Sequence, residues 1–277
     1  MALTLLLYHS VDESGSFLSV SPDAFRRQMR ALRRSGRRVL SVAEAVRAAR
    51  AGDPLRDAAC VTFDDAYLSV AETAWPILKD EGLTATIYCV SGRMGGSADW
   101  LRRDFPAVFA EPPDDEAALR EVDSGLTIGA IRDRALAADP AEALRRASAL
   151  PIMGWDAIRA LMAEGADTGG HTLTHPRLSH LDPGAAAREV ADDREALAEA
   201  LGTRPMTFAY PFGDLSDAAV AAVRDAGYAA AVTSAPGGVL VPDRDPYRWA
   251  RIGIWPDVRP WKMRLYLSRL YPLLRAA

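Results

Sequence analysis

The sequence has few residues that could cross-link the chain and little net charge. It contains two cysteines among 277 residues, and its formal net charge is −4. Both cysteines, Cys60 and Cys89, stand in apolar runs, where a free thiol usually packs as a small hydrophobic side chain, so we expect no disulfide. Since no large excess of Lys and Arg is available to neutralise phosphates, we also expect no nucleic-acid partner.

Long apolar runs are also missing. No segment reaches the roughly 20 apolar residues that a membrane-spanning helix needs, so we expect no transmembrane segment. The apolar residues 1–8 lack the basic start and the small-residue cleavage site of a signal peptide, and they continue directly into Tyr8-His9-Ser10. We therefore predict a cytoplasmic location.

The composition that remains is that of an ordinary globular enzyme, with 49% apolar and 25% charged residues. Short apolar runs typical of buried strands alternate with amphipathic segments that carry helix caps. The expected strands are 3–7, 59–63, 84–90, a short run before His171, 206–210, 229–233 and 249–254. The expected helices are 22–36, 41–52, 70–81, 155–164, 182–202 and 216–227. About seven alternations without a linker predict a single α/β domain over residues 1–277, either a parallel barrel or a wound sheet.

Two segments depart from this alternation. Residues from about 97 to 150 are rich in Ala, Arg, Asp and Glu, and we interpret them as a helical insertion. We expect a solvated excursion without a catalytic role, although its position after a strand would also let it cover the mouth of a barrel. The stretch of about 259–275 mixes aromatic with basic side chains and predicts a C-terminal helix packed against the barrel, with peripheral contact to a membrane as the alternative.

Polar residues follow several of the predicted strands. They are His9, Asp64, Asp65, His171 and the turn at 210–213. Because the C-terminal ends of barrel strands meet on one face, we expect these residues to form one site. An Asp-Asp pair alone usually caps a turn, and two histidines four residues apart usually lie on a surface, so the inference depends on their joint placement.

This set contains the ligands of a catalytic metal. One carboxylate of the Asp64-Asp65 pair, together with His171 and His175, makes a three-ligand set with open positions for a divalent metal, and zinc is our first choice. A metal-bound water would be acidified there and a substrate carbonyl polarised. The other carboxylate would act as general base. The residues alone leave open which Asp has which role.

Three stretches carry a family resemblance: Thr62-Phe63-Asp64-Asp65, His171-Thr172-Leu173-Thr174-His175 and Phe208-Ala209-Tyr210-Pro211-Phe212-Gly213. They resemble the first three motifs of the polysaccharide deacetylases, the NodB-homology or carbohydrate esterase family 4. The similarity extends from His9 to about Trp255, apart from the insertion. It implies a distorted (β/α) barrel that uses a divalent metal to remove acetyl groups from carbohydrates.

The resemblance also implies roles for single residues. It makes Asp64 the general base, whereas Asp65, His171 and His175 bind the metal. The backbone amide of Phe212 is expected to help stabilise the oxyanion.

Two departures from the family pattern concern the catalytic carboxylate. Ala66 follows the Asp pair where the family has Gly, a change that should be tolerated unless the turn needs a positive φ. Ala209 stands where the family has an Arg that orients the catalytic carboxylate. We predict that Arg251, next to the last expected strand, replaces this Arg, with an ordinary surface or structural Arg as the alternative.

A third departure concerns the general acid. The family's last motif ends in a histidine that protonates the leaving group, and this chain has no histidine after His180. The strand that ends in His9 is similar to the start of the deacetylases acting on poly-N-acetylglucosamine, in which that position supplies the acid. We therefore predict that His9 protonates the leaving amine or alkoxide, with a structural histidine as the alternative.

These features predict a metal-dependent hydrolase that removes acetyl groups, N-acetyl rather than O-acetyl, from an acetylated carbohydrate. A metal-dependent amidohydrolase acting on a small non-sugar amide would use the same set of residues. A carbohydrate-binding pseudoenzyme would explain the weak third motif and the missing last motif, but not the intact metal ligands and Asp64.

Overall fold

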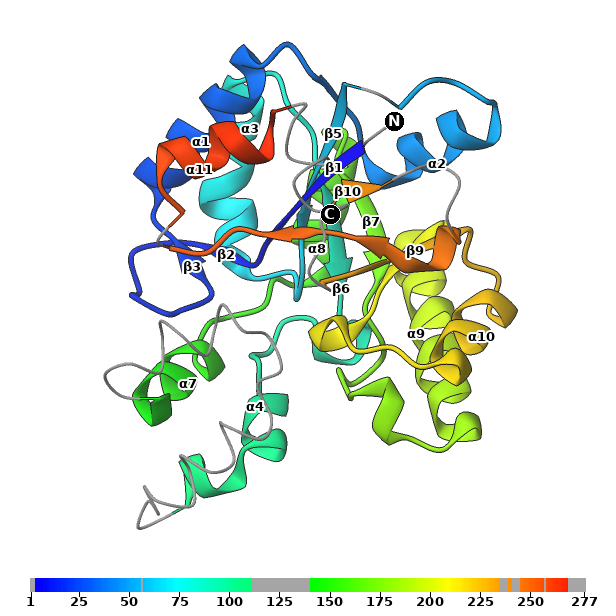
Figure 1. The fold of residues 1–277 in the computed structure, drawn as a ribbon. Coiled ribbons are helices and arrows are strands. Elements are labelled where there is room, and N and C mark those ends of the chain that lie inside the picture. The colour runs from blue at the N-terminus through cyan, green and yellow to red at the C-terminus, as the bar shows by residue number, and fades with distance from the viewer. Residues whose placement is uncertain are drawn as a thin grey trace.

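The centre of the protein is a mostly parallel sheet (Figure 1). The structure is a computed structural model, and it describes residues 3–55, 57–110, 140–234, 239–240, 245–256 and 258–268. Its parallel strands follow one another in the order β1 (Leu3–Tyr8), β5 (Ala58–Phe63), β6 (Thr86–Cys89), β7 (Asp167–Gly170), β8 (Thr207–Ala209) and β9 (Ala230–Thr233).

An interrupted strand joins β9 and β1, the two ends of this series of parallel strands. Its first half, β11 (Trp249–Ala250), pairs with β9, and its second half, β12 (Ile252–Gly253), pairs with β1. The sheet is therefore nearly closed into a barrel, which confirms the predicted α/β barrel rather than an open wound sheet. The predicted strand 249–254 is found, but it changes partner at Arg251.

Shorter strands lie beside this barrel. The pair β10 (Val239–Leu240) and β1 is antiparallel, and β4 (Arg38–Val39) runs parallel to β5. A separate two-stranded sheet is formed by β2 (Ser10–Val11) and β3 (Ser19–Val20).

The helices between the strands form where the caps predict them. The helices are α1 (Pro22–Arg34), α2 (Val42–Arg50), α3 (Trp75–Asp80) preceded by a π-helical turn (Val70–Ala74), α8 (Trp155–Ala163), α9 (Pro183–Leu201) and α10 (Asp217–Asp225). Ser41 and Glu44 form the expected capping box on α2. Asp182 caps α9, and Gly202 ends it in the left-handed conformation. Short 3-10 turns span Ser91–Arg93, Leu178–His180, Pro211–Gly213 and Pro246–Arg248.

Alternation along the strands decides which side chains fill the barrel. Leu5 of β1 and Cys60 of β5 belong to one buried cluster with Tyr88 of β6, Val232 of β9 and Trp249 of β11. Side chains from strands this far apart in the sheet can meet only in its interior. Since neighbouring residues on a strand face opposite ways, residues an even number of positions later also face inward.

The described parts of the insertion lie at one end of the barrel, where α4 (Trp100–Asp104), a 3-10 turn (Pro106–Phe109) and α7 (Pro140–Ser148) pack together (Figure 1). Trp100 and Leu101 are buried, so the expectation of a solvated excursion is wrong for these residues. The rest of the predicted insertion, 111–139, lies outside the described residues.

The C-terminal helix packs on the flank of the barrel. Helix α11 (Pro260–Tyr266) lies beside α1 and buries Met263, whereas Trp261 stays 57% exposed (Figure 1). It ends before the predicted boundary at 275, and 269–275 lies outside the described residues. No helix among the described residues has the length and apolar character to span a membrane.

Candidate functional site

The strand register turns three of the predicted site residues toward the barrel interior. His9, Asp64 and Arg251 each stand an even number of positions after an interior residue of the same strand or its extension. They therefore converge at the C-terminal ends of the strands, where the predicted barrel site was expected.

One cavity of about 50 Å³ brings most of the predicted residues together. It is lined by His9, Asp64, Asp65, His171, His175 and Phe212, with Arg251 placed behind Asp64. Among the four histidines, His180 is exposed and has no place in this cavity.

Several residues of the cavity are held in strained backbone conformations. The turn after β5 has positive φ at both Asp65 (68°) and Ala66 (53°), and His175 and Phe212 also have positive φ, of 60° and 58°. The turn thus needs the left-handed conformation at the position where the family has Gly, so the condition for easy replacement by Ala is not met. A non-glycine residue in this region costs about 1–3 kcal/mol, and such strain collects at functional sites.

Arg251 forms a two-pronged ion pair with Asp64. Its Nη1 donates to Asp64 Oδ1 at 2.6 Å and its Nη2 to Oδ2 at 2.7 Å, and Nη1 also donates to Thr62 Oγ1 at 3.1 Å. Arg251 is 2% exposed, so it is not a surface residue. Burial raises the pKa of Asp64, but the charge and hydrogen bonds of Arg251, together with His171 and His9, bring the net pKa below its ordinary value. Asp64 is therefore ionised at neutral pH, as a base must be.

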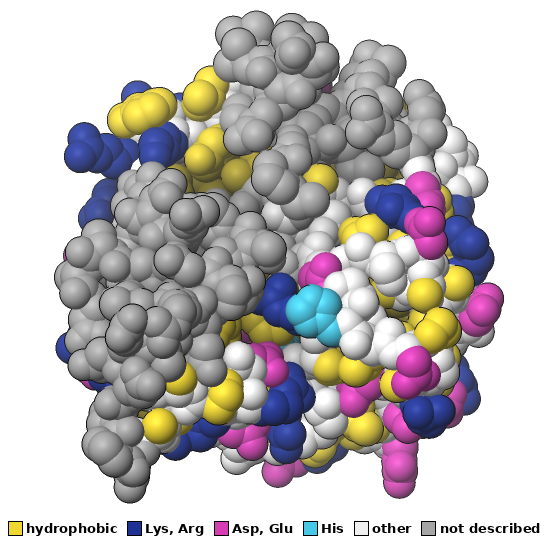
Figure 2. Space-filling model, turned by 60° about the horizontal axis from the view of Figure 1, so that its bottom comes forward, with side chains coloured by type: hydrophobic (Ala, Val, Ile, Leu, Met, Phe, Trp, Pro, Cys, Tyr) yellow, Lys and Arg dark blue, Asp and Glu magenta, His cyan; other side chains and the backbone are white. Residues whose placement is uncertain are grey.

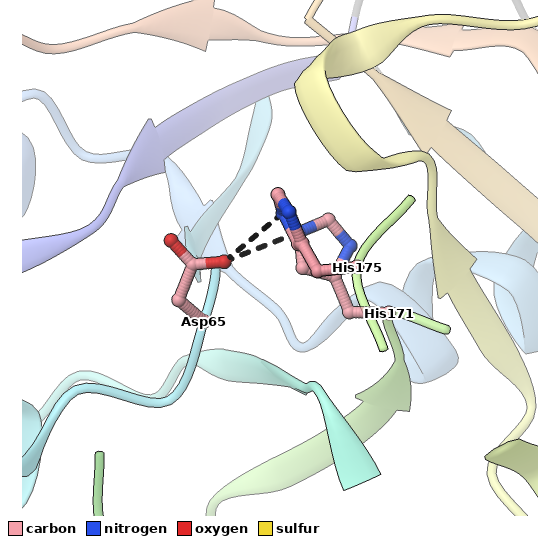
Figure 3. Close-up of side chains that lie close together, drawn as sticks. All are labelled: Asp65, His171 and His175. Carbon is pink, nitrogen blue, oxygen red and sulfur yellow. Dashed lines mark ion pairs between the residues drawn. The ribbon is translucent and has the colours of Figure 1, made fainter. Parts of the chain in front are cut away.

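The carboxylate of Asp65 faces two neighbouring imidazoles (Figure 3). Asp65 Oδ1 is 3.5 Å from His171 Nε2 and 3.3 Å from His175 Nε2, and one ligand atom from each residue lies within 4.8 Å of the others. Atoms bound about 2.1 Å from one tetrahedral ion stand about 3.4 Å apart, so the two distances from Asp65 Oδ1 suit a single zinc-sized ion.

The protonation of the two imidazoles also suits a metal. Nδ1 of His171 donates to the carbonyl oxygen of Ala209 at 2.7 Å, which leaves the lone pair of Nε2 directed toward Asp65. Burial lowers the pKa of both His171 and His175, which keeps them in the neutral form that binds metal.

Among the described residues, Asp65 forms no ion pair with an Arg or Lys. Its side chain is buried, and Oδ1 accepts no hydrogen bond from the described residues. Burial raises the pKa of Asp65 well above its ordinary value, and the neighbouring Asp64 carboxylate raises it further. A bound cation would supply the missing positive charge, so the donor set fits a divalent metal.

His9 lines the same cavity but is not one of the three grouped ligands. Its ring stacks on Trp255 with centroids 5.5 Å apart, and it is partly buried. Burial lowers the pKa of His9 to about 4, while the Asp64 carboxylate acts in the opposite direction. His9 is therefore mostly neutral at neutral pH, and its imidazolium is a strong proton donor once it forms.

The insertion contributes walls that the sequence did not predict. Trp100, Leu101 and Leu144 line the cavity, and Trp100 stacks on His175 with centroids 4.4 Å apart. The sequence feature that could have indicated this is the pair Trp100-Leu101, within a segment rich in Ala, Arg, Asp and Glu. The alternative expectation, an insertion that covers the barrel mouth, holds for these residues.

The surface around this end carries no dominant charge where it is described. Figure 2 looks toward the end at which α4 and α7 lie, and basic, acidic and apolar side chains are interspersed over its coloured part. The described surface there offers no broad field of one sign.

The chain is similar to proteins of one known family. The family model described as polysaccharide deacetylase matches residues 51–231. The Bacillus subtilis (strain 168) protein YxkH is 22% identical over 97% of this chain and 77% of its own length.

Two solved structures share the fold. One is the Streptococcus pyogenes deacetylase PplD in complex with acetate, with a TM-score of 0.71, 20% identity, and coverage of 97% of this chain and 99% of that one. The other is IcaB from Ammonifex degensii, with a TM-score of 0.70, 22% identity, and coverage of 96% and 97%. The family match spans well over half of the chain and includes the turn after β5 and the loop after β7. The chain therefore belongs to the polysaccharide deacetylase family and is a carbohydrate deacetylase.

Proposed function

We propose that this deacetylase removes N-acetyl groups from its carbohydrate substrate and that it needs a divalent metal, zinc, to do so. The observation that carries the proposal is that one cavity holds two carboxylates in different environments. Asp64 is held ionised by Arg251, and Asp65 faces His171 and His175 and forms no ion pair with an Arg or Lys among the described residues. Asp64 is thus suited to accept a proton, and Asp65 is suited to bind a cation.

In this proposal Asp65, His171 and His175 hold the metal. When bound, a divalent cation supplies Lewis acidity, which acidifies water and polarises a carbonyl. Asp64 accepts the proton of the attacking water, because its carboxylate is ionised and opens into the same cavity. Arg251 keeps both oxygens of Asp64 in place during this transfer.

Two further residues of the cavity act on the leaving group and the oxyanion. In its protonated, imidazolium form His9 donates a proton to the departing nitrogen, which is a far poorer leaving group than a sugar hydroxyl unless it is protonated. The amide of Phe212, at the turn after β8, donates to the developing oxyanion.

The size of the cavity supports recognition of an acetyl group. Its volume of about 50 Å³ is far below the roughly 300–1,000 Å³ of sites that enclose a drug-sized ligand. Leu18, Trp100 and Leu101 give it an apolar wall suited to a methyl group. The acetyl group would enter this cavity while the sugar stays outside it.

Acetate release tests the proposal. The protein is offered N-acetylated oligosaccharides, O-acetylated oligosaccharides and small acetamides, before and after removal of metal with a chelator and again after Zn²⁺ is restored. We expect release from N-acetylated glycans that is lost with the metal and recovered with Zn²⁺. Release that is unaffected by the chelator, or that occurs only from O-acetyl esters or small acetamides, would refute it.

Replacing His9 with Ala is expected to lower turnover by about 100-fold or more without loss of metal, since a positioned general acid contributes about 10²–10⁴-fold. The ring of His9 is not part of the metal set, so zinc content should equal that of the wild type. His171→Ala should lose both zinc and turnover. His180→Ala, which removes an exposed histidine outside the cavity, serves as the matched control and should change neither. A near-wild-type rate for His9→Ala would show that another group is the acid.

A further inference from the structure

The two metal-binding histidines are oriented in different ways. His171 is fixed by the hydrogen bond from its Nδ1 to Ala209. The corresponding nitrogen of His175 is buried and has no hydrogen-bond partner among the described residues. Since a ligating histidine usually owes its orientation to a hydrogen bond on its second nitrogen, something else must hold the His175 ring.

Aromatic packing surrounds the His175 ring. The indole of Trp100 stacks on it with centroids 4.4 Å apart and planes 29° apart. Phe212 approaches it edge-on, with centroids 4.7 Å apart and planes 65° apart. Trp100 is 2% exposed and His175 4% exposed, so the stack is closed to solvent. Stacking on an electron-rich indole is also more favourable for an imidazole that a bound cation makes electron-poor.

The same helix that carries Trp100 also holds the backbone of His175. Arg103 of α4 donates from Nη1 to the carbonyl oxygen of Thr174 at 3.1 Å and from Nη2 to that of His175 at 2.9 Å. His175 has a positive φ of 60°, which a residue other than glycine adopts only when its surroundings impose it. Arg103 is among the groups that impose it.

We propose that α4 of the insertion positions His175 for metal binding, with Trp100 and Arg103 as the positioning residues. Trp100 fixes the plane of the imidazole, and Arg103 fixes the backbone from which it projects. Neither residue contacts the metal in this assignment, and Trp100 also forms part of the cavity wall. The inference rests on the proposed metal-dependent function, and it gives the insertion a part in assembling the metal site.

The test measures the affinity of the metal-free protein for Zn²⁺ by competition with a coloured chelator. Trp100→Ala is expected to raise the dissociation constant about 10–100-fold, the usual effect of removing a group that orients a metal ligand. Trp100→Phe keeps an aromatic face and should recover most of this loss. Arg103→Met should weaken binding several-fold. The absorption spectrum of the Co²⁺-loaded Trp100→Ala protein should also differ from that of the wild type, because the coordination geometry relaxes.

Two matched controls separate positioning from general destabilisation. Trp75→Ala removes another buried indole, one that does not line the cavity, and Arg102→Met changes the neighbouring exposed arginine of α4. Both should bind Zn²⁺ as the wild type does. Because Arg103 is partly exposed, Arg103→Met tests the proposal even if Trp100→Ala does not fold.

The outcomes distinguish this proposal from the proposed function. If folded Trp100→Ala and Arg103→Met both bind Zn²⁺ with wild-type affinity, α4 has no positioning role, although the metal site stands. The same holds if Trp75→Ala and Arg102→Met lose as much affinity as the α4 variants. If the wild type itself binds Zn²⁺ no better than His171→Ala does, the metal site of the proposed function is refuted.

Discussion

Replacing Asp64 with Asn is expected to lower the rate of acetate release by about 10²–10⁴-fold while bound zinc stays in place. Asn has the shape of Asp but cannot accept the proton of the attacking water, so the contribution of the general base is lost. Asp64 Oδ2 is 3.9 Å from His171 Nε2, and the residue is not one of the three grouped ligands. Steady-state kinetics and zinc content per protein, measured on the same preparation, check the prediction.

Asp65→Asn is the paired control, because it changes the adjacent residue in the same chemical way. It should lose zinc, since Asp65 supplies the one carboxylate of the donor set. Circular dichroism of both variants shows whether they remain folded, because Asp64→Asn deprives the buried Arg251 of its counter-charge. Equal loss of zinc in the two variants would contradict the division of roles between them.

The convergence of the site residues could be predicted from the sequence because parallel strands place their C-terminal ends on one face. Asp64 and the turn at Phe212 each follow an apolar run, His171 follows a short expected strand, and the structure brings all three to one cavity. Arg251 was predicted from its place beside the last strand. Strand alternation explains the contact, since Arg251 stands two positions after the interior residue Trp249 and meets Asp64 inside the barrel.

Other parts of the site depend on packing that leaves no periodic signal. Trp100 lies in an insertion that must fold back over the barrel before its indole can reach His175. The residues around Trp100 show no periodic pattern that predicts this fold-back. The positive φ of Ala66 was also hidden, because alanine normally disfavours it and only the surrounding turn imposes it. The break between β11 and β12 arises because one short strand must pair with both β9 and β1 to close the sheet.

Arg251→Met is expected to destabilise the protein by about 3–5 kcal/mol at neutral pH, because it leaves a buried carboxylate without its partner. For a chain of this size, such a loss lowers the melting temperature by on the order of 10 °C. Arg251→Lys keeps the charge but not the two-pronged contact and should fall between. Arg248→Met, which removes an exposed ion pair with Asp217, should cost less than about 1 kcal/mol. The double variant Asp64→Asn/Arg251→Met should recover part of the loss, since it buries neither charge.

The pH dependence of Arg251→Met follows from the pKa of Asp64. In the wild type Arg251 holds this pKa below its ordinary value, so the stabilisation by the pair is present at neutral pH and is lost as the pH falls through the lowered pKa. In the variant burial acts without Arg251 and raises the pKa, so the destabilisation should be larger at pH 7 than at pH 4. The acidic limb of kcat/KM should move to higher pH for the same reason, because the base is then protonated over a wider range. Zinc content is measured at each pH, since protonation of His171 and His175 would release metal from both proteins alike. An unshifted acidic limb in a zinc-loaded, folded Arg251→Met protein would mean that Arg251 does not control the ionisation of the catalytic carboxylate.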